Sequence, residues 1–364
     1  MKILVYGAGV IGRVYAAKLH EAGQEVTILA RGRSQDDLRS HGVVLENQQT
    51  GVRTVAPVRV IDHLESGIAY DLVLVAVRKN QLASVLPDLA RNQFTPNILF
   101  LVNNAAGSEE MTDALGPERV LLGFPGAGGE REGNLVRYGL VTRGLQATTL
   151  GELDGNVTPR LRWIASVLKS AGFPVAFSRN MDAWLKTHVA IVSPTANAIY
   201  LAGGETRSLA RTRDGLVMLV RAVREGLRVL RQLGVPITPS RLRILEWIPE
   251  PVWVFILQYG LNTQRAELIL ARHANAARDE MSLLADEFQR LSQKSDEPTP
   301  YMDRLRAYLD PACPTIEEGS REIPLNMTGL YLVLGAGIAT ALAGWWGAKH
   351  FVTGKRDICH NSKG

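Results

Sequence analysis

The first half of the chain alternates apolar runs with stretches of helical spacing. Residues 2–6, 71–77 and 97–102 are nearly continuous apolar runs, which are typical of parallel strands buried on both faces. Residues 14–22, between the first two runs, have the apolar spacing of a helix. This alternation predicts an α/β domain of the Rossmann type, with a parallel sheet, over residues 1–165.

The pattern changes from strands to helices in the second half. Residues 181–200 begin a long helical region, and residues 267–293 form another polar–apolar helix. We therefore predict an all-helical substrate domain over residues 166–312. One of its helices carries a basic stripe, which is either a solvated face or a surface for an anionic membrane or ligand; the stripe consists of Arg221, Arg224, Arg228 and Arg231.

The C-terminal part has a different composition from both domains. From Ile323 to Ala348 no residue is charged, and a helix of about 20 apolar residues crosses a bilayer. Tyr331 and a pair of tryptophans near the other end are typical of interfacial anchors. We predict a transmembrane helix over residues 323–348 and a short basic tail over 349–364. The alternative is a buried last helix of the second domain.

Composition and charge exclude several classes of protein. The chain has 364 residues, 46% hydrophobic and 21% charged, which is the balance of a globular protein. A net charge of +5, scattered along the chain, is too weak to indicate a nucleic-acid binder. Cys313 and Cys359 lack the spaced partners that zinc requires, so we expect neither a metal site nor a disulfide framework.

A glycine triplet joins the first predicted strand to the first helix. Gly7, Gly9 and Gly12 fit the G-x-G-x-x-G pattern of a dinucleotide site. The first permits a tight turn, the second lets the backbone approach a pyrophosphate, and the third allows close contact between helix and strand. Val10 and Ile11 begin the helix, whose unpaired N–H groups and positive dipole end attract phosphate.

A second strand is predicted over residues 25–30, and the residues at its end discriminate between the two nicotinamide cofactors. NAD sites place a carboxylate there for the ribose hydroxyl. This chain has Arg31 and Arg33 instead, and guanidinium groups suit a 2′-phosphate. The sequence therefore predicts NADPH as the cofactor, the alternative being a surface arginine pair without a ligand.

In this order the motifs resemble the ketopantoate reductase (2-dehydropantoate 2-reductase) family, over residues 1–295. The similar segments are GAGVIG, ARGR, DLVLVAVRKNQ, LVNNAAG, TLGELDG and WLKTHVAIVSPTANAIY. The resemblance implies an oxidoreductase of the CH–OH class that reduces a 2-keto acid with NADPH. It also implies pantothenate biosynthesis as the pathway.

The resemblance implies two catalytic residues. Lys186 matches the family's lysine, which would stabilise the alkoxide and donate a proton to it. Glu280 is the nearest match to the family's glutamate, and we expect its carboxylate to face Lys186. Leu268 stands where the family has a serine, so His273 and Asn275 are the nearby polar alternatives.

Further contacts are expected around these two residues. Asn104 matches the family's asparagine between cofactor and substrate, and Arg78 takes the place of a lysine near the cofactor. Ser193 and Asn197 share the side of the helix that carries Lys186, and we expect them to bind substrate. The family's first helix asparagine is replaced by Ala190, so the natural substrate need not be ketopantoate.

Two other functions stay open on the sequence. One is a catalytically degenerate NADP-binding scaffold or redox sensor tethered to a membrane, and the other is a different hydroxyacid or opine-type dehydrogenase. We expect a small keto acid and a second copy of the chain as partners. The N-terminus has no targeting signal, and NADPH is supplied in the cytoplasm, so we expect a cytoplasmic catalytic part held to the membrane by the C-terminal helix. The basic tail favours the opposite orientation.

Overall fold

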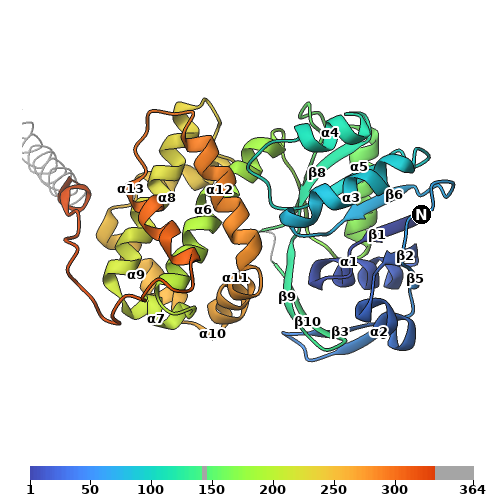
Figure 1. The fold of residues 1–364 in the computed structure, drawn as a ribbon, viewed down its shortest axis with the longest axis horizontal. Coiled ribbons are helices and arrows are strands. Elements are labelled where there is room, and N and C mark those ends of the chain that lie inside the picture. Colours follow the sequence, from blue (N-terminus) through green and yellow to red (C-terminus); the bar gives the residue numbers. More distant parts are fainter. Residues whose placement is uncertain (142–145, 333–364) are drawn as a thin grey trace, which may run out of the picture.

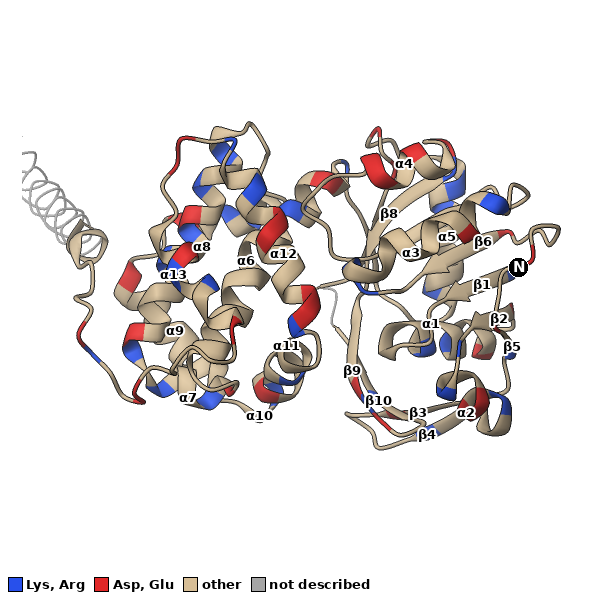
Figure 2. Ribbon diagram, viewed as in Figure 1, with Lys and Arg blue, Asp and Glu red and all other residues tan. Residues whose placement is uncertain are grey.

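The computed structural model describes residues 1–141 and 146–332, which form two lobes (Figure 1). The lobe that contains the N-terminus holds the sheets, and the other lobe is helical. Charged side chains of both signs are intermixed over the two lobes (Figure 2). The first half of the chain is thus α/β and the second half is helical, as the sequence pattern predicts.

The main sheet is parallel except where β11 runs antiparallel to β8. Its strands are β1 (Lys2–Tyr6), β2 (Glu25–Leu29), β5 (Arg59–Ile61), β6 (Leu72–Val75), β7 (Ile98–Leu101), β8 (Val120–Phe124), β11 (Thr148–Gly151) and β12 (Val175–Phe177). They lie in the order β12-β11-β8-β7-β6-β1-β2-β5. The carboxyl ends of β1, β6, β7 and β8 therefore meet at one edge, where such sheets bind their ligands.

Helices cover both faces of this sheet. In β1, Ile3 and Val5 pack in the same core as residues of α1 (Val10–Glu21) and α5 (Pro159–Ser170). Leu4 packs in the opposite core with residues of α3 (Leu82–Arg91) and α4 (Glu109–Leu115). This alternation explains why the strands are continuous apolar runs, because neither face of the sheet meets water.

A second sheet was not predicted. Its order is β4-β3-β10-β9, with β3 (Val43–Asn47), β4 (Arg53–Ala56), β9 (Ala127–Glu132) and β10 (Leu135–Leu140). β9 reads AGGERE and has little apolar periodicity, so its pairing with β10 gives no signal in the sequence. The connecting helix α2 (Arg33–His41) leads from β2 into this sheet.

The expected domain boundary lies inside an element. Residue 165 falls in the middle of α5, and β12, which follows α5, pairs with β11 in the main sheet. The first lobe therefore extends through Phe177 rather than ending at 165. A parallel edge strand of three residues is too short to recognise by its pattern.

The helical lobe begins with α6 (Met181–Leu201), which remains one α-helix although it contains Pro194. It continues with α7 (Thr206–Arg211), α8 (Arg213–Gln232), η2 (Ser240–Glu246), α9 (Glu250–Leu261), α10 (Gln264–Ala266), η3 (Glu267–Ala271), α11 (Arg272–Ala276), α12 (Arg278–Ser292), α13 (Pro300–Arg306) and η4 (Ala307–Leu309). The single helix expected over 267–293 is wrong. Ala277 leaves the helical conformation, with φ −126° and ψ 32°, and separates α11 from α12.

The basic stripe of α8 is used inside the lobe. Arg221 pairs with Glu250 of α9 at 2.9 Å, and Arg224 lies 5.5 Å from the ring of Trp253. Arg228 and Arg231 form ion pairs with Glu297 and Glu246. The stripe is therefore neither a solvated face nor an open anion surface, because each guanidinium holds a neighbouring segment against α8.

The chain after α13 lies against α8 and α9. Asp214 of α8 accepts hydrogen bonds from the backbone of Glu322 at 2.8 Å and Ile323 at 2.9 Å. Glu250 accepts another from the backbone of Asn326 at 2.8 Å. Ordered structure thus continues beyond residue 312, where the sequence predicts the second domain to end.

The predicted membrane segment falls largely outside the described residues. Residues 328–332 are helical, while residues 333–348 and the tail at 349–364 lie beyond them. Within residues 1–141 and 146–332, no helix has the length and apolar character needed to span a bilayer.

Candidate functional site

The glycine loop between β1 and α1 is shaped by backbone contacts. Gly7 has a φ of 114°, and a Cβ there would lie 2.5 Å from the carbonyl oxygen of Ala76. A Cβ at Gly12 would lie 1.9 Å from the carbonyl oxygen of Gly7, so α1 approaches β1 as closely as only glycine permits. A Cβ at Gly9 meets nothing within 4 Å. The loop is therefore tight at its two ends and open in the middle.

The open side of this loop is the start of α1. Gly9 is the N-cap residue, and half-buried Val10 and Ile11 are the first two helical residues. The first N–H groups of a helix have no partner within it, and the dipole makes this end positive. The loop and the helix start therefore have the backbone geometry that the G-x-G-x-x-G pattern predicts, close-packed at Gly7 and Gly12 and open at Gly9.

The two predicted arginines after β2 lie in different surroundings. Arg31 pairs with Asp88 at 2.8 Å and also donates to the hydroxyl of Tyr6 at 3.3 Å. Burial, with Asp88 as a further cause, raises the pKa of Tyr6 to about 12, so this hydroxyl stays neutral. Arg33, the first residue of α2, is exposed. Arg31 is thus engaged by a carboxylate, whereas Arg33 forms no ion pair within residues 1–141 and 146–332.

Two further residues join Arg33 and were not predicted. Ser34, the next residue of α2, accepts a hydrogen bond from Arg131 of β9 at 3.0 Å. The second sheet thus brings another guanidinium to the N-terminus of α2, where the helix dipole also favours an anion. Ser34 could have been found in the sequence as the residue after ARGR, whereas Arg131 is nearly one hundred positions away.

Arg13, which follows Gly12, carries a buried positive charge beneath the loop. Its side chain is fully buried and its Nε atom donates to the carbonyl oxygen of Ala8 at 3.0 Å. Its Nη2 atom has no hydrogen-bond partner among the described residues. Burial, and then the neighbouring charge of Arg131, lower the pKa of Arg13 to about 10, which still leaves it positive at neutral pH.

Arg78, expected near the cofactor, reaches across to the helical lobe. Its guanidinium lies 3.1 Å from the carboxylate of Asp279 and donates to the carbonyl oxygen of Ala276 at 2.7 Å. Asn80 of η1 (Lys79–Gln81) donates to the same carboxylate at 2.8 Å. The N-terminus of α12 is thus tied to the segment that follows β6.

Glu280 lies in this interface. From the sequence its carboxylate is expected to face Lys186, but its hydrogen-bond partners are Lys79 and Asn103. The carboxylate is buried, and its Oε1 atom accepts hydrogen bonds from the backbone of Lys79 at 3.3 Å and from Asn103 at 3.2 Å. Two turns later on α12, Glu287 is also buried and accepts a hydrogen bond from the backbone of Ala105 at 3.0 Å. Residues seven apart share one face of a helix, and here that face meets the carboxyl edge of the sheet.

The ammonium of Lys79 lies between the carboxylates of Glu110 and Glu287. Its side chain is only 5% exposed, and its Nζ atom lies 3.2 Å from Glu110 and 3.4 Å from Glu287. A buried charge is tolerated when its partners are charged and hydrogen-bonded, as they are here. Lys79, Asn103 and Glu287 were not singled out in the sequence, although Lys79 and Asn103 adjoin the predicted Arg78 and Asn104.

Asn104, the predicted bridge between cofactor and substrate, closes its own loop. It is buried, its Oδ1 atom accepts from the backbone of Ala106 at 3.1 Å, and its Nδ2 atom donates to the carbonyl oxygen of Gly107. The neighbouring Asn103 reaches Glu280 instead, and its Oδ1 atom is buried without a partner among the described residues.

Lys186 is held by its own helix. Its Nζ atom lies 2.5 Å from the carboxylate of Asp182, one turn earlier, and its side chain is 15% exposed. Trp184 and Leu185 belong to the core beneath the sheet. Because successive helical residues are turned by about 100°, Lys186 points to a different side of α6 from Trp184. The carboxylate that faces Lys186 is Asp182, which corrects the expected pairing with Glu280.

His188 is on the side of α6 that faces the sheet, and the sequence reasoning missed it. Its ring stacks on Trp184 with centroids 5.5 Å apart, and it lies 4.2 Å from the ring of Phe124, the last residue of β8. Burial, and to a lesser degree the nearby His273, lower the pKa of His188 to about 4. Its position two residues after Lys186 was the available signal.

The polar alternatives on α11 divide between two places. Desolvation lowers the pKa of His273 below its usual range, and the smaller effect of the nearby Glu280 raises it. His273 also contributes to the low pKa of His188, and part of its own surface is exposed. Asn275 donates to the carbonyl oxygen of Gly204 at 2.9 Å and so supports a turn of the helical lobe. His273 therefore belongs to the interface, whereas Asn275 does not.

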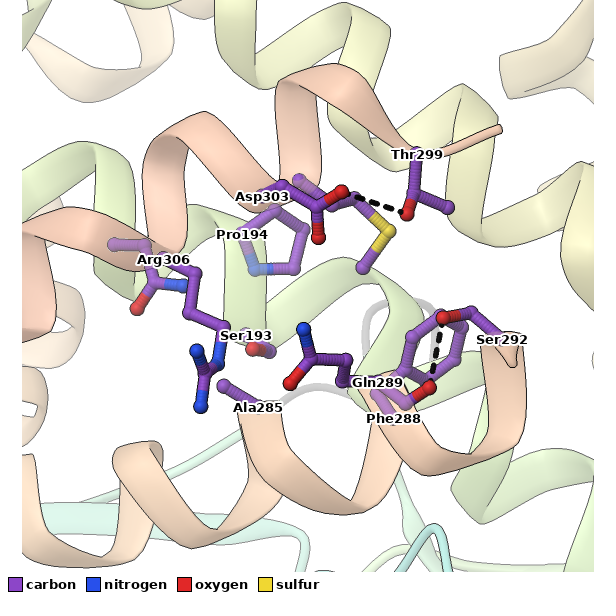
Figure 3. A pocket seen from close by; sticks show the side chains of 11 residues that line it. Ser193, Pro194, Ala285, Phe288, Gln289, Ser292, Thr299, Asp303 and Arg306 are labelled. Atoms are coloured by element: carbon purple, nitrogen blue, oxygen red, sulfur yellow. Dashed lines mark hydrogen bonds between the residues drawn. The ribbon is translucent and has the colours of Figure 1, made fainter. Parts of the chain in front are cut away.

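Ser193 and Asn197, expected to bind substrate, line a small pocket between α6, α12 and α13 (Figure 3). The pocket has a volume of about 20 Å³ and is also lined by Gln289, Asp303 and Arg306. Neither Lys186 nor Glu280 belongs to its lining. The two residues are brought together as predicted, but inside the helical lobe.

No cluster of side chains in residues 1–141 and 146–332 is suited to a metal ion. The polar features near the carboxyl edge of the sheet thus comprise the start of α1, the cationic start of α2, and the interface of α6 and α12 with that edge. A loop for phosphates at one end, and titratable groups at the other, suit a dinucleotide and a small polar substrate.

Solved structures with the same architecture are known. A 2-dehydropantoate 2-reductase from Geobacter metallireducens is 18% identical with a TM-score of 0.70, covering 86% of this chain and 100% of its own. D-mandelate dehydrogenase, solved with NADH and anilino(oxo)acetate, is 18% identical with a TM-score of 0.69, covering 85% of this chain and 97% of its own. At this identity the likeness establishes the fold.

The sequence comparisons match the first part of the chain to a known family. Residues 3–155 match the family described as ketopantoate reductase PanE/ApbA. A 2-dehydropantoate 2-reductase of Mesorhizobium japonicum is 27% identical over 268 residues, which are 65% of this chain and 79% of that protein. The first part of the chain is thus similar to the ketopantoate reductase family. On this similarity the chain is an oxidoreductase that acts on a CH–OH group.

Proposed function

We propose that this chain uses NADPH to reduce a small 2-keto acid to the 2-hydroxy acid in the cleft between its lobes. The observation that carries the proposal is the open cradle at Gly9, where a Cβ would meet nothing within 4 Å at the start of α1. The family and the solved likeness to an enzyme with bound NADH support a nicotinamide cofactor. Pantothenate biosynthesis is the pathway that the relatives' names suggest.

The residues present fit NADPH. Gly9, Val10 and Ile11 would hold the pyrophosphate through backbone N–H groups, with the charge of Arg13 beneath them. Arg33, Ser34 and Arg131 would hold the 2′-phosphate, because guanidinium and hydroxyl donors at a helix N-terminus suit a phosphate monoester. When bound, NADPH supplies the hydride that the carbonyl carbon receives.

The chain must then supply a proton to the carbonyl oxygen. We propose Lys186 as the donor, because it occupies the position of the family's lysine and lies in the helix that adjoins β8. Asp182, at 2.5 Å, holds the amine of Lys186 in its present position. For this role the side chain must release Asp182 and turn toward the carboxyl edge of the sheet.

His188 is the second candidate for the donor. Its ring lies 4.2 Å from that of Phe124 at the carboxyl end of β8. Unlike Lys186, this side chain therefore does not have to turn to reach the carboxyl edge of the sheet. With a pKa of about 4 it is neutral at pH 7. The carboxylate of a bound keto acid would raise that pKa, since an opposite charge favours the imidazolium form.

The experiment is NADPH oxidation by the full chain in detergent, with a panel of 2-keto acids, followed over a range of pH. We expect turnover with at least one acid, and a loss of about 100-fold or more in kcat for the variant that lacks the donor. The variants are Lys186→Ala and His188→Gln, with Lys169→Ala on exposed α5 as the control. Loss of the alkaline limb of the pH profile distinguishes a proton donor from a structural residue.

The same assay contains the results that would overturn the proposal. NADPH binding without turnover of any keto acid would favour the nucleotide-binding scaffold or sensor. Turnover of an amino-acid adduct or a 3-keto acid in place of a 2-keto acid would favour an opine-type or other hydroxyacid dehydrogenase. Equal use of NADH would contradict the assignment of Arg33 and Arg131 to a 2′-phosphate.

Three features outside the chemistry also stay proposals. We propose a cytoplasmic catalytic part, because a reductase needs a supply of NADPH. We propose a homodimer, which mass measurement in solution tests. The C-terminal membrane helix rests on the apolar sequence up to Ala348, and extraction of the full chain by alkaline carbonate tests it.

A further inference from the structure

Exposed apolar side chains gather on the outer side of α9 and at the end of η2. They are Ile244, Trp247, Val252, Phe255, Ile256 and Tyr259, which we call the α9 face. Trp247 is 76% and Tyr259 67% exposed. The last four side chains follow the spacing i, i+3, i+4, i+7 and therefore form one stripe of the helix.

The α9 face is not needed for the fold of the lobe. Trp253, Val254 and Leu261, on the inner side of α9, are buried in the core of the helical lobe. After Glu250 the helix has no charged residue, and it is drawn almost entirely tan at the outer edge of the lobe (Figures 1 and 2). An apolar stripe on both sides of a surface helix indicates that the outer side meets something other than water.

The border of the α9 face is basic. Arg243 on η2, and Arg265 just after α9, are exposed. The carboxylates in this stretch are engaged elsewhere, since Glu246 pairs with Arg231 and Glu250 with Arg221. An apolar surface with aromatic side chains and an arginine border suits an anionic lipid headgroup layer.

The path of the chain points to the same side. Arg221 donates to the carbonyl oxygen of Pro324 at 2.7 Å, which fixes the segment before residue 328. A Cβ on Gly329 would lie 3.6 Å from the Cα of Pro249, so the last described turn passes the N-terminus of α9. Tyr331 is 64% and Leu332 70% exposed. The uncharged stretch of sequence up to Ala348 therefore begins beside the α9 face.

We propose that the α9 face lies on the surface of an anionic lipid bilayer, with Trp247 and Tyr259 at the level of the headgroups. This interaction is independent of the reaction in the cleft. A second copy of the chain is the competing occupant. A symmetric pair of α9 faces would bring two arginine borders together, without a free carboxylate on η2 or α9 to receive them, so the lipid surface is favoured.

The first test uses the full chain in vesicles of phosphatidylcholine and phosphatidylglycerol, three to one, with brominated acyl chains. Tryptophan fluorescence of the wild type is compared with that of Trp247→Phe, and the difference gives the emission of Trp247. The same comparison with Trp163→Phe, on α5 of the other lobe, gives the emission of a control tryptophan. We expect the Trp247 signal to be quenched by at least half and that of Trp163 to be unaffected. An unquenched Trp247 overturns the proposal, including the case in which a second copy covers it.

The second test asks whether the whole stripe contributes. The triple variant Phe255→Ser, Ile256→Ser, Tyr259→Ser should lose most of the quenching of Trp247, and hydrogen exchange in α9 on vesicles should rise about tenfold or more. Phe94→Ser, at a 66% exposed position of the other lobe, should change neither. If the triple variant is quenched like the wild type, α9 does not touch lipid and the proposal fails.

Discussion

The two lobes contribute functional atoms to the candidate site in different ways. On the nucleotide side the cradle is made of backbone, and its shape follows from contacts such as that between Gly12 and the carbonyl oxygen of Gly7. On the helical side, side chains make the site, and Glu280 and Lys186 both have partners other than the expected ones. A backbone site is fixed by local sequence, whereas a side-chain site depends on how α6 and α12 are rotated and docked.

The largest effect is expected on the nucleotide side, from Gly12→Ala. The added Cβ would lie 1.9 Å from backbone, so α1 must move away from β1. We expect NADPH affinity to fall by about 100-fold and the free energy of unfolding to fall by about 1–3 kcal/mol, as overpacking typically costs. Fluorescence titration and thermal unfolding measure the two quantities.

Two matched glycines separate the cause. Gly9→Ala should weaken NADPH binding without changing stability, because the Cβ enters only the space kept for phosphate. Gly128→Ala, in β9, also has open space around it and should change neither quantity. Equal stability of all three variants would contradict the close contact between α1 and β1.

The next effect tests the interface at the carboxyl edge of the sheet. Lys79→Met leaves Glu287 buried without its ammonium, and breaking a buried pair in this way costs about 3 kcal/mol. Arg53→Met, which breaks a surface pair with Glu46 at 2.5 Å, should cost far less, because water screens this exposed pair. Urea unfolding compares the two, and similar losses would mean that water reaches Lys79.

A smaller effect concerns His188. Its pKa falls from the usual 6.5 to about 4 in the folded chain, so the unfolded chain takes up the proton first as the pH falls. This histidine therefore has no effect on stability above pH 6.5, and from pH 7 to pH 5 it should lower the free energy of unfolding by about 2 kcal/mol. His188→Gln should remove that loss, and His41→Gln, at an exposed position, should keep it. A wild-type stability without this pH dependence would place His188 in solvent.

The smallest effect separates the two cofactors. Arg33→Ala combined with Arg131→Ala should raise the Kd of NADPH by about tenfold or more, the value of one or two charge-assisted hydrogen bonds. The Kd of NADH should stay within about twofold, since it has no 2′-phosphate. Arg39→Ala, in the last turn of α2, is the control. An equal loss for both cofactors would show that these arginines serve the fold or the pyrophosphate.

The sequence predicts the nucleotide half well, and the reason is local. Strands β1, β6 and β7 are apolar runs because both faces of the sheet are buried. The close contact of Gly12 with Gly7 lies within six residues, although Gly7 also meets Ala76 at the end of β6. The second sheet and β12 escape prediction because β9 has little apolar pattern and β12 has only three residues. Partners far away in the sequence fix β10 against β3 and β12 against β11.

On the helical side, a motif gives a residue's position in the chain but not its neighbours. Lys186 fits the family's pattern, yet its partner is Asp182, a contact within one helix that the pattern does not specify. Asn104 was expected between cofactor and substrate, but the neighbouring Asn103 is the asparagine that contacts Glu280. One position in a loop, or about 100° around a helix, changes which side chain enters the cleft.

The most direct measurement is transfer of deuterium from NADPH labelled on the nicotinamide ring, with the full chain and each keto acid of the panel. We expect a 2-hydroxy acid with one deuterium on the former carbonyl carbon, formed by the wild type and lost in Gly12→Ala. Binding of NADPH without any labelled hydroxy acid would contradict a reductase that joins the glycine cradle to the α6 side of the cleft.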